Sequence, residues 1–172
     1  MKTVDSTKAY MVSALMAALA NILSIEPFTI TIAIGPFVSK IHLTQLPIFI
    51  SAALSGPLAG LLTGAIGGLY MSYSVGIPFI VGGLAILGFS AGFFSTRFKS
   101  RPFLSSVFAW GIQAPYVFVT DYFWFVYSRL MPSPIALTVI TTILINLTIE
   151  AIISSIIVTI VLRYIKRIGL FQ

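Results

Sequence analysis

The chain has 172 residues, of which 58% are hydrophobic and only 8% are charged. Soluble domains carry roughly a quarter charged residues, so this composition excludes an ordinary soluble protein and indicates a chain that is solvated by lipid. The chain has no cysteine and a single histidine, His42. Disulfides and thiolate metal sites are therefore excluded, and we expect no metal centre, no Ser-His-Asp triad and no cofactor.

Six apolar runs with short breaks between them predict an all-α membrane protein, a bundle of six transmembrane helices that forms a single domain over residues 1–172. The helices are expected at residues 8–25, 43–55, 58–73, 78–95, 102–126 and 134–163. Crossing the hydrocarbon core takes about 20 residues, so the second and third helices need tilt, neighbours or local thinning of the bilayer. Pro115 is expected to kink the fifth helix.

The first predicted helix carries small residues at a spacing of four. Ala14 and Ala18 share one face, and Ser13 and Ala17 share another, so a second helix can approach the backbone closely. Two interpretations stay open: the strip packs inside the bundle, or Ala14 and Ala18 receive a partner protein. Glycines of the third helix have the same spacing, and for them we favour ordinary packing inside the bundle.

The connection between the first two helices, residues 27–41, is apolar rather than polar. Apolar and hydroxyl residues alternate with period two over residues 28–34, which predicts an extended or hairpin-like segment, and Gly35-Pro36 then turns the chain. An apolar loop has to bury one face, and the mouths of the neighbouring helices are the nearest surface. We interpret the loop, residues 28–40, as a lid over the outer opening of the bundle, or as a cap that only packs there.

Polar side chains in or beside apolar helices are costly in lipid, which makes them the candidates for function. The candidate substrate-binding residues are Lys40, His42, Gln45, Gly82, Gln113, Tyr116, Asp121, Trp124 and Asn146. Rings, amides and a carboxylate together can hold a planar, polar small molecule in the outer half of the bundle, between the lid and helices four to six. The alternative is hydrogen bonding between helices without any ligand.

Glu150 shares a helix face with Asn146 but lies deeper toward the cytoplasm by the helix rise of about 1.5 Å per residue, so we favour a structural or coupling role for it. The same estimate separates Asp121 and Glu150 by on the order of 10 Å in depth, which is unfavourable for paired acid chemistry. HExxH, GxSxG and Walker A motifs are absent from the sequence. We therefore expect a protein that is not an enzyme.

The basic residues predict the orientation in the membrane. Eight of the ten fall on one side of a six-helix topology, against Lys40 and Arg129 on the other. The eight are Lys2, Lys8, Arg97, Lys99, Arg101, Arg163, Lys166 and Arg167. Because basic residues favour the cytoplasmic side, both termini are expected in the cytoplasm. Topology thus explains the net charge of +6, and we expect no nucleic-acid partner.

In its short helices, its alanine strip, its apolar outer loop and the Gly-containing segment 54–64, the chain resembles the S components of energy-coupling factor (ECF) vitamin transporters. The resemblance implies a multi-pass subunit of the plasma membrane that binds a vitamin or related micronutrient with high affinity on the outer side. It implies three protein partners, a transmembrane coupling subunit and two ATPase subunits, reached by docking through Ala14 and Ala18. It also implies that the loop acts as a gate.

The segment from Lys40 to Pro47 is similar to a lysine-to-proline stretch of the riboflavin-specific subunits, so a riboflavin-like substrate is the first candidate. Those subunits usually carry acidic residues where this chain has His42 and Gln45. Two alternatives stay open, an autonomous channel or secondary transporter and a membrane scaffold without ligand. Inverted repeats would favour the transporter, and residues 1–86 and 87–172 show no convincing similarity.

Overall fold

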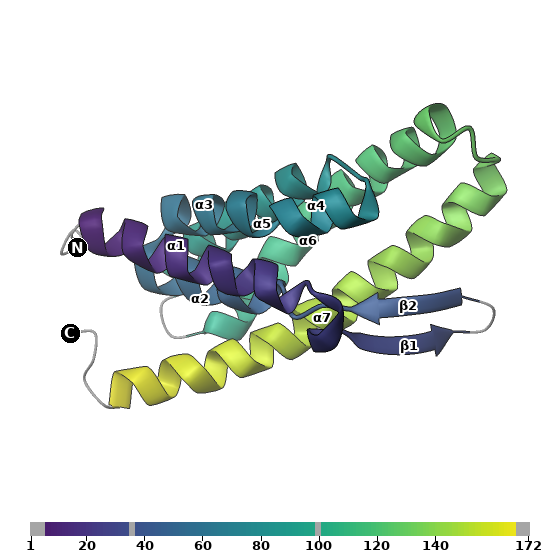
Figure 1. Ribbon diagram of the computed structural model, residues 1–172. Coiled ribbons are helices and arrows are strands. Elements are labelled where there is room, and N and C mark those ends of the chain that lie inside the picture. Colours follow the sequence, from purple (N-terminus) through teal and green to yellow (C-terminus); the bar gives the residue numbers. More distant parts are fainter. Residues whose placement is uncertain (1–5, 35–36, 99–100, 168–172) are drawn as a thin grey trace.

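The computed structural model describes residues 6–34, 37–98 and 101–167, and these form helices with one β-hairpin (Figure 1). The α-helices are α1 Ser6–Leu23, α2 Gln45–Ser55, α3 Pro57–Gly67, α4 Leu69–Val75, α5 Ile80–Arg97, α6 Pro102–Phe123 and α7 Ser133–Arg167. The other elements are the 3-10 turn η1 Glu26–Phe28, the strands β1 Ile30–Ile34 and β2 Phe37–Ile41, and the π-helical turn η2 Trp124–Ser128.

Among the residues that the structure describes, four helical stretches are long and apolar enough to cross a membrane: Pro57–Val75, Ile80–Arg97, Pro102–Ser128 and Ser133–Ile165. The expected all-α membrane fold is thereby confirmed at this level, while α1 and α2 are shorter, with 18 and 11 residues. α7 has 35 residues, about 50 Å of helix, so it is longer than the hydrocarbon core is thick. Figure 1 shows α7 crossing the other helices obliquely.

The third expected helix is divided into α3 and α4 at Gly68. Asn21 of α1 bridges this break: its side-chain amide donates to the carbonyl of Ile66 at 3.0 Å, and its amide oxygen accepts the N–H of Tyr70 at 3.0 Å. A helix break inside lipid is tolerated when neighbouring side chains satisfy the freed backbone groups. α6, by contrast, continues through Pro115 without ending.

Glycines bring α3 and α5 into backbone contact. A Cβ atom added at Gly60 would lie 2.2 Å from the carbonyl oxygen of Gly88, and one added at Gly64 would lie 2.0 Å from that of Leu84. No side chain fits at these distances, so the glycines of α3 serve packing inside the bundle, as expected from their spacing. The buried core continues from this contact into α2 through Ile48.

The two small-residue pairs of α1 have different environments. Ser13 and Ala17 are buried. The Ser13 hydroxyl donates a hydrogen bond to the carbonyl oxygen of Ala59 in α3, at 3.3 Å. Ala14 and Ala18 lie on a different face of the helix and are exposed. The structure therefore assigns internal packing to the first pair and leaves the second pair open to a partner.

The connection between α1 and α2 forms an antiparallel hairpin, β1–β2, in which Ile30 pairs with Ile41 and Thr31 with Lys40. The period-two alternation predicted such a segment. The expected turn at Gly35-Pro36 lies outside the described residues. An ion pair between Lys40 in β2 and Glu26 in η1 ties the hairpin to its own base, and β2 packs against α7.

Candidate ligand-binding site

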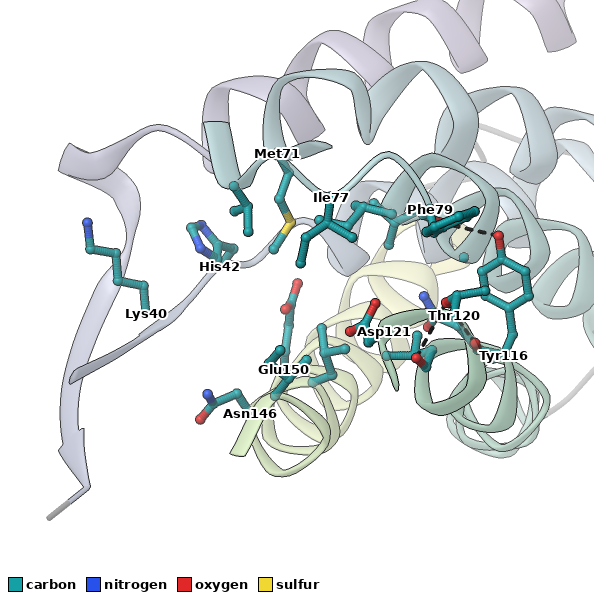
Figure 2. A pocket seen from close by; sticks show the side chains of 18 residues that line it. Lys40, His42, Met71, Ile77, Phe79, Tyr116, Thr120, Asp121, Asn146 and Glu150 are labelled. Atoms are coloured by element: carbon teal, nitrogen blue, oxygen red, sulfur yellow. Dashed lines mark hydrogen bonds between the residues drawn. The ribbon is translucent and has the colours of Figure 1, made fainter. Parts of the chain in front are cut away.

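A cavity of about 340 Å³ lies between the end of the hairpin, α4, α5, α6 and α7 (Figure 2). Its size falls in the range typical of small-molecule sites, about 300–1,000 Å³. Most of its wall is apolar, built from Met71, Val75, Ile77, Phe79, Ile80, Leu84, Val117, Ile143 and Leu147. An apolar wall with a few polar groups can bury a vitamin-sized molecule and orient it.

Six of the nine predicted binding residues line this cavity: Lys40, His42, Gln113, Tyr116, Asp121 and Asn146. They come from three different parts of the chain, namely the hairpin with its exit, α6 and α7. The structure therefore places polar groups from these three parts around one cavity.

Gln45 does not line the cavity. It is fully buried at the start of α2, where its side-chain amide donates to the carbonyl of Leu147 at 3.3 Å. Its backbone N–H donates to the carboxylate of Glu150 at 2.9 Å. Both contacts join α2 to α7, so Gln45 helps to position these two helices relative to each other.

Gly82 does not line the cavity either, but it makes room for Tyr116, which does. A Cβ atom at Gly82 would lie 2.3 Å from the Tyr116 hydroxyl oxygen, so a larger residue there would displace this ring from its position. The Tyr116 hydroxyl in turn lies 3.4 Å from the carbonyl oxygen of Phe79, to which it donates. The neighbouring Gly83 lines the cavity in place of Gly82.

Trp124 lies behind the wall. Its ring meets the ring of Phe79 edge to face, with centroids 6.0 Å apart, and Arg129 stacks over it at 5.4 Å. Phe79 is the side chain that lines the cavity. Trp124 therefore supports the wall from outside.

Glu150 lines the same cavity as Asp121, although the depth estimate from helix rise separated the two. The estimate measured distance along each helix axis, whereas α7 crosses the bundle obliquely (Figure 1). Glu150 is only 2% exposed, and its carboxylate accepts the N–H at the first turn of α2. This contact places a carboxylate at a helix N-terminus, where the helix dipole favours negative charge.

The mouth of the cavity carries Lys40 and His42. Lys40 is engaged with Glu26, and the ammonium group lowers the pKa of the Glu26 carboxyl through hydrogen bonding and charge. Burial, and then the nearby Lys40 charge, lower the pKa of His42, so its imidazole is neutral at pH 7. Its Nδ1 atom is buried and has no hydrogen-bond partner among the described residues.

The apolar lining residues were not identified from the sequence. In a membrane protein an apolar side chain that faces a cavity looks the same in sequence as one that faces lipid. Only polar residues stand out against such a background, which is why six polar lining residues were found and the apolar wall was not.

The chain matches the family model described as ECF-type riboflavin transporter, S component, over residues 4–167. No significant match is found among curated proteins. Among solved structures, the S component for biotin from an ECF-type ABC transporter is similar, with a TM-score of 0.64, 20% sequence identity and coverage of 95% of each chain. At this identity the likeness shows a shared fold.

Proposed function

The chain belongs to the family of S components of ECF-type riboflavin transporters, and from this premise we propose that the cavity beside the hairpin binds the vitamin from the outer side of the membrane. Membership makes the chain a vitamin-binding membrane subunit of a transporter. The observation that carries the proposal is the convergence of polar groups from the hairpin, α6 and α7 on one largely apolar cavity.

Riboflavin is the first candidate for the ligand. Support comes from the family and from the cavity, whose apolar wall suits a planar ring system while Gln113 and Asn146 offer directed hydrogen bonds. This chain differs from the riboflavin-specific subunits at His42 and Gln45, but only His42 lines the cavity, because Gln45 does not reach it. Titration of the purified protein with riboflavin, followed by quenching of flavin fluorescence, tests the assignment. Saturable binding is expected, and its absence would remove riboflavin as the substrate.

The hairpin is proposed to gate the cavity. Lys40 and His42 at its end line the mouth, and β2 packs against α7, so a ligand in the cavity can contact the hairpin directly. Ligand contacts made only in the closed arrangement would favour closure. A protease site introduced at Gly35 should be cut more slowly when riboflavin is present. Cleavage at the same rate with and without the bound vitamin would leave the hairpin as a passive cap.

Delivery is proposed to follow docking of α1 on the coupling subunit of an ECF module that carries two ATPase subunits in the plasma membrane. The exposed strip of Ala14 and Ala18 supports this role, because it allows close approach by another helix. Met11 and Leu15 beside it are exposed as well, at 67% and 66%. The other small pair of α1, Ser13 and Ala17, is buried inside the bundle, where Ser13 contacts α3.

A six-crossing topology with cytoplasmic termini is proposed for the whole chain. The start of α1, the end of α5, the start of α6 and the end of α7 lie at one end of the molecule (Figure 1). Basic residues described at these helix ends are Lys8, Arg97, Arg101, Arg163 and Arg167. Such an accumulation favours the cytoplasmic side for this end.

A further inference from the structure

The interruption between α3 and α4 is filled by a side chain from a third helix. In a continuous helix the N–H of Tyr70 would donate to the carbonyl of Ile66, four residues earlier. At the break, which lies at Gly68, both groups bond to Asn21 of α1. The Asn21 amide donates to the Ile66 carbonyl and accepts the Tyr70 N–H, each at 3.0 Å. One side chain thus takes the place of one backbone hydrogen bond.

The Asn21 amide is held in this position by its own helix. Its nitrogen also donates to the carbonyl of Ala17 at 3.0 Å, so both of its N–H donors and its oxygen are used. α1 packs closely at this level, because a Cβ atom added at Gly67 would lie 2.7 Å from the Cβ of Ala20. A side chain that inserts into the backbone hydrogen bonds of a helix kinks it. Asn21 therefore fixes the direction in which α4 leaves α3.

α4 carries part of the cavity wall. Met71 directly follows Tyr70, and both Met71 and Val75 line the cavity. Figure 2 shows Met71 beside Ile77, another lining residue, which follows α4 in the chain. The opposite wall belongs to α6 and α7. A change in the direction of α4 would therefore move one wall of the cavity relative to the other.

Asn21 also lies next to the proposed docking strip. It follows Ala14 by seven residues and Ala18 by three, and these spacings place the three residues on nearly the same side of α1. Ala14 and Ala18 are exposed, whereas Asn21 is half-buried and reaches across to α3 and α4. A partner helix that packs on the strip would therefore lie beside the residue that occupies the break.

We propose that Asn21 is a positioning residue that couples docking of α1 to the cavity: its amide holds the α3–α4 break open and thereby holds Met71 and Val75 in the wall. The proposal rests on the proposed docking of α1 and on vitamin binding in the cavity. The break has two arrangements, one with the amide inserted and one with the Tyr70 N–H bonded directly to the Ile66 carbonyl. Both backbone groups keep a hydrogen bond in each, so lipid penalises neither. Displacement of the amide by a docked partner would shift α4 and weaken the hold on the vitamin.

The first test measures riboflavin binding by the purified protein. Asn21→Leu removes the amide at similar size, so the Tyr70 N–H should return to the Ile66 carbonyl and riboflavin should bind several-fold more weakly. Adding Tyr70→Pro should restore most of the affinity, because proline has no N–H, opposes a continuous helix and is tolerated in the first turn of α4. Adding Tyr70→Ala instead keeps the N–H and should restore nothing.

Ser13→Ala is the matched control for loosening α1 against α3. It removes the hydroxyl that donates to the carbonyl of Ala59 and leaves the break untouched, so the Kd for riboflavin should not change. Equal affinities of wild type and Asn21→Leu would overturn the positioning role. A Tyr70→Pro double variant that binds no better than the Tyr70→Ala double variant would overturn it as well.

A cysteine at Met71 tests the same role without any vitamin, because the chain has no other cysteine. Its rate of reaction with a small water-soluble thiol reagent should change several-fold in Asn21→Leu and return when Tyr70→Pro is added. An unchanged rate would contradict the positioning role. If wild type does not bind riboflavin but the rates change as expected, the riboflavin assignment fails and the positioning role holds.

Uptake by the assembled transporter tests the coupling to docking. The double variant Asn21→Leu/Tyr70→Pro holds the break open without a contact from α1. It should therefore bind riboflavin but take it up several-fold more slowly than wild type. Recovery of uptake together with binding would overturn the coupling.

Discussion

At the scale of single residues, Asn146 and Glu150 show how one face of α7 serves two purposes. The residues are four apart, so they share a face, and both line the cavity. The carboxylate of Glu150 also accepts a hydrogen bond from the backbone N–H of Gln45, which connects the cavity wall to the start of α2. This face of α7 therefore joins the cavity to the segment that follows the hairpin.

Replacing Asn146 by alanine should weaken vitamin binding. Loss of one hydrogen bond to a neutral ligand group costs about 0.5–1.5 kcal/mol, which corresponds to an increase in Kd of several-fold. Isothermal titration calorimetry with the bound vitamin measures the change. Thr141→Ala is the matched control, because Thr141 is exposed on the same helix and its hydroxyl donates to the carbonyl of Leu137 in that helix. An unchanged Kd in Asn146→Ala would remove this residue from the site.

At the scale of elements, the contact between α3 and α5 depends on backbone approach. Gly60, Gly64 and Gly88 leave no space for a side chain where the two helices cross. Packing of this kind drives helix association in lipid, where the hydrophobic effect between helices is absent. α5 also supplies Ile80 and Gly83 to the cavity, so this contact holds one wall of the site in place.

Gly64→Val should destabilise the protein, because its Cβ would lie 2.0 Å from the carbonyl oxygen of Leu84, a backbone atom that cannot move independently. Overpacking typically costs about 1–3 kcal/mol, and a lower apparent Tm in detergent is expected. Gly111→Ala is the control, since no described atom lies within 4 Å of the position that its Cβ would take. Equal melting temperatures for the two variants would contradict the close packing of α3 and α5.

The exposed alanines of α1 make a separate prediction about partner docking. Ala14→Trp or Ala18→Trp should leave vitamin binding by the isolated subunit unchanged and abolish uptake by the assembled transporter, because bulk on a small-residue strip keeps helices apart. Ile160→Trp tests added bulk at another exposed position, 61% accessible on α7. Ala17→Trp should instead impair folding, since Ala17 is buried. If the two exposed variants lose vitamin binding together with uptake, α1 does not dock in this way.

At the scale of the whole molecule, the fold places its basic helix ends together and its hairpin elsewhere. In Figure 1 the hairpin extends from the bundle away from the start of α1, and the η2–α7 connection with Arg129 lies at the end opposite the start of α1. The cavity lies beside the hairpin rather than at the basic end. A vitamin entering past the hairpin would thus arrive from the side that carries fewer basic residues.

The absence of cysteine from the chain permits a direct test of orientation. Single cysteines at Lys8 and Arg167 should be protected from a membrane-impermeant maleimide in intact cells, whereas one at Ser133 should react. Permeabilisation should make the first two reactive, which shows that protection came from the bilayer. Labelling of the Lys8 or Arg167 variant in intact cells would reverse or change the topology.

Much of the architecture was predictable because lipid imposes simple rules. Long apolar runs must be helical to satisfy their backbone groups, so the helices lie close to the expected ranges. The period-two pattern of residues 28–34 indicated the hairpin, and six of the rare polar residues line the candidate cavity. These signals are local, and each is legible in a single segment of the chain.

The sequence by itself thus determined the class of protein, the helices and most polar residues of the site, because composition and spacing control how a chain meets lipid. The tertiary structure decided which small pair of α1 is free, that Gln45 joins helices, and that Glu150 shares a cavity with Asp121. It also decided which apolar side chains line the cavity. These facts depend on helix rotation and on the oblique path of α7, which arise from packing between distant segments and leave no local pattern.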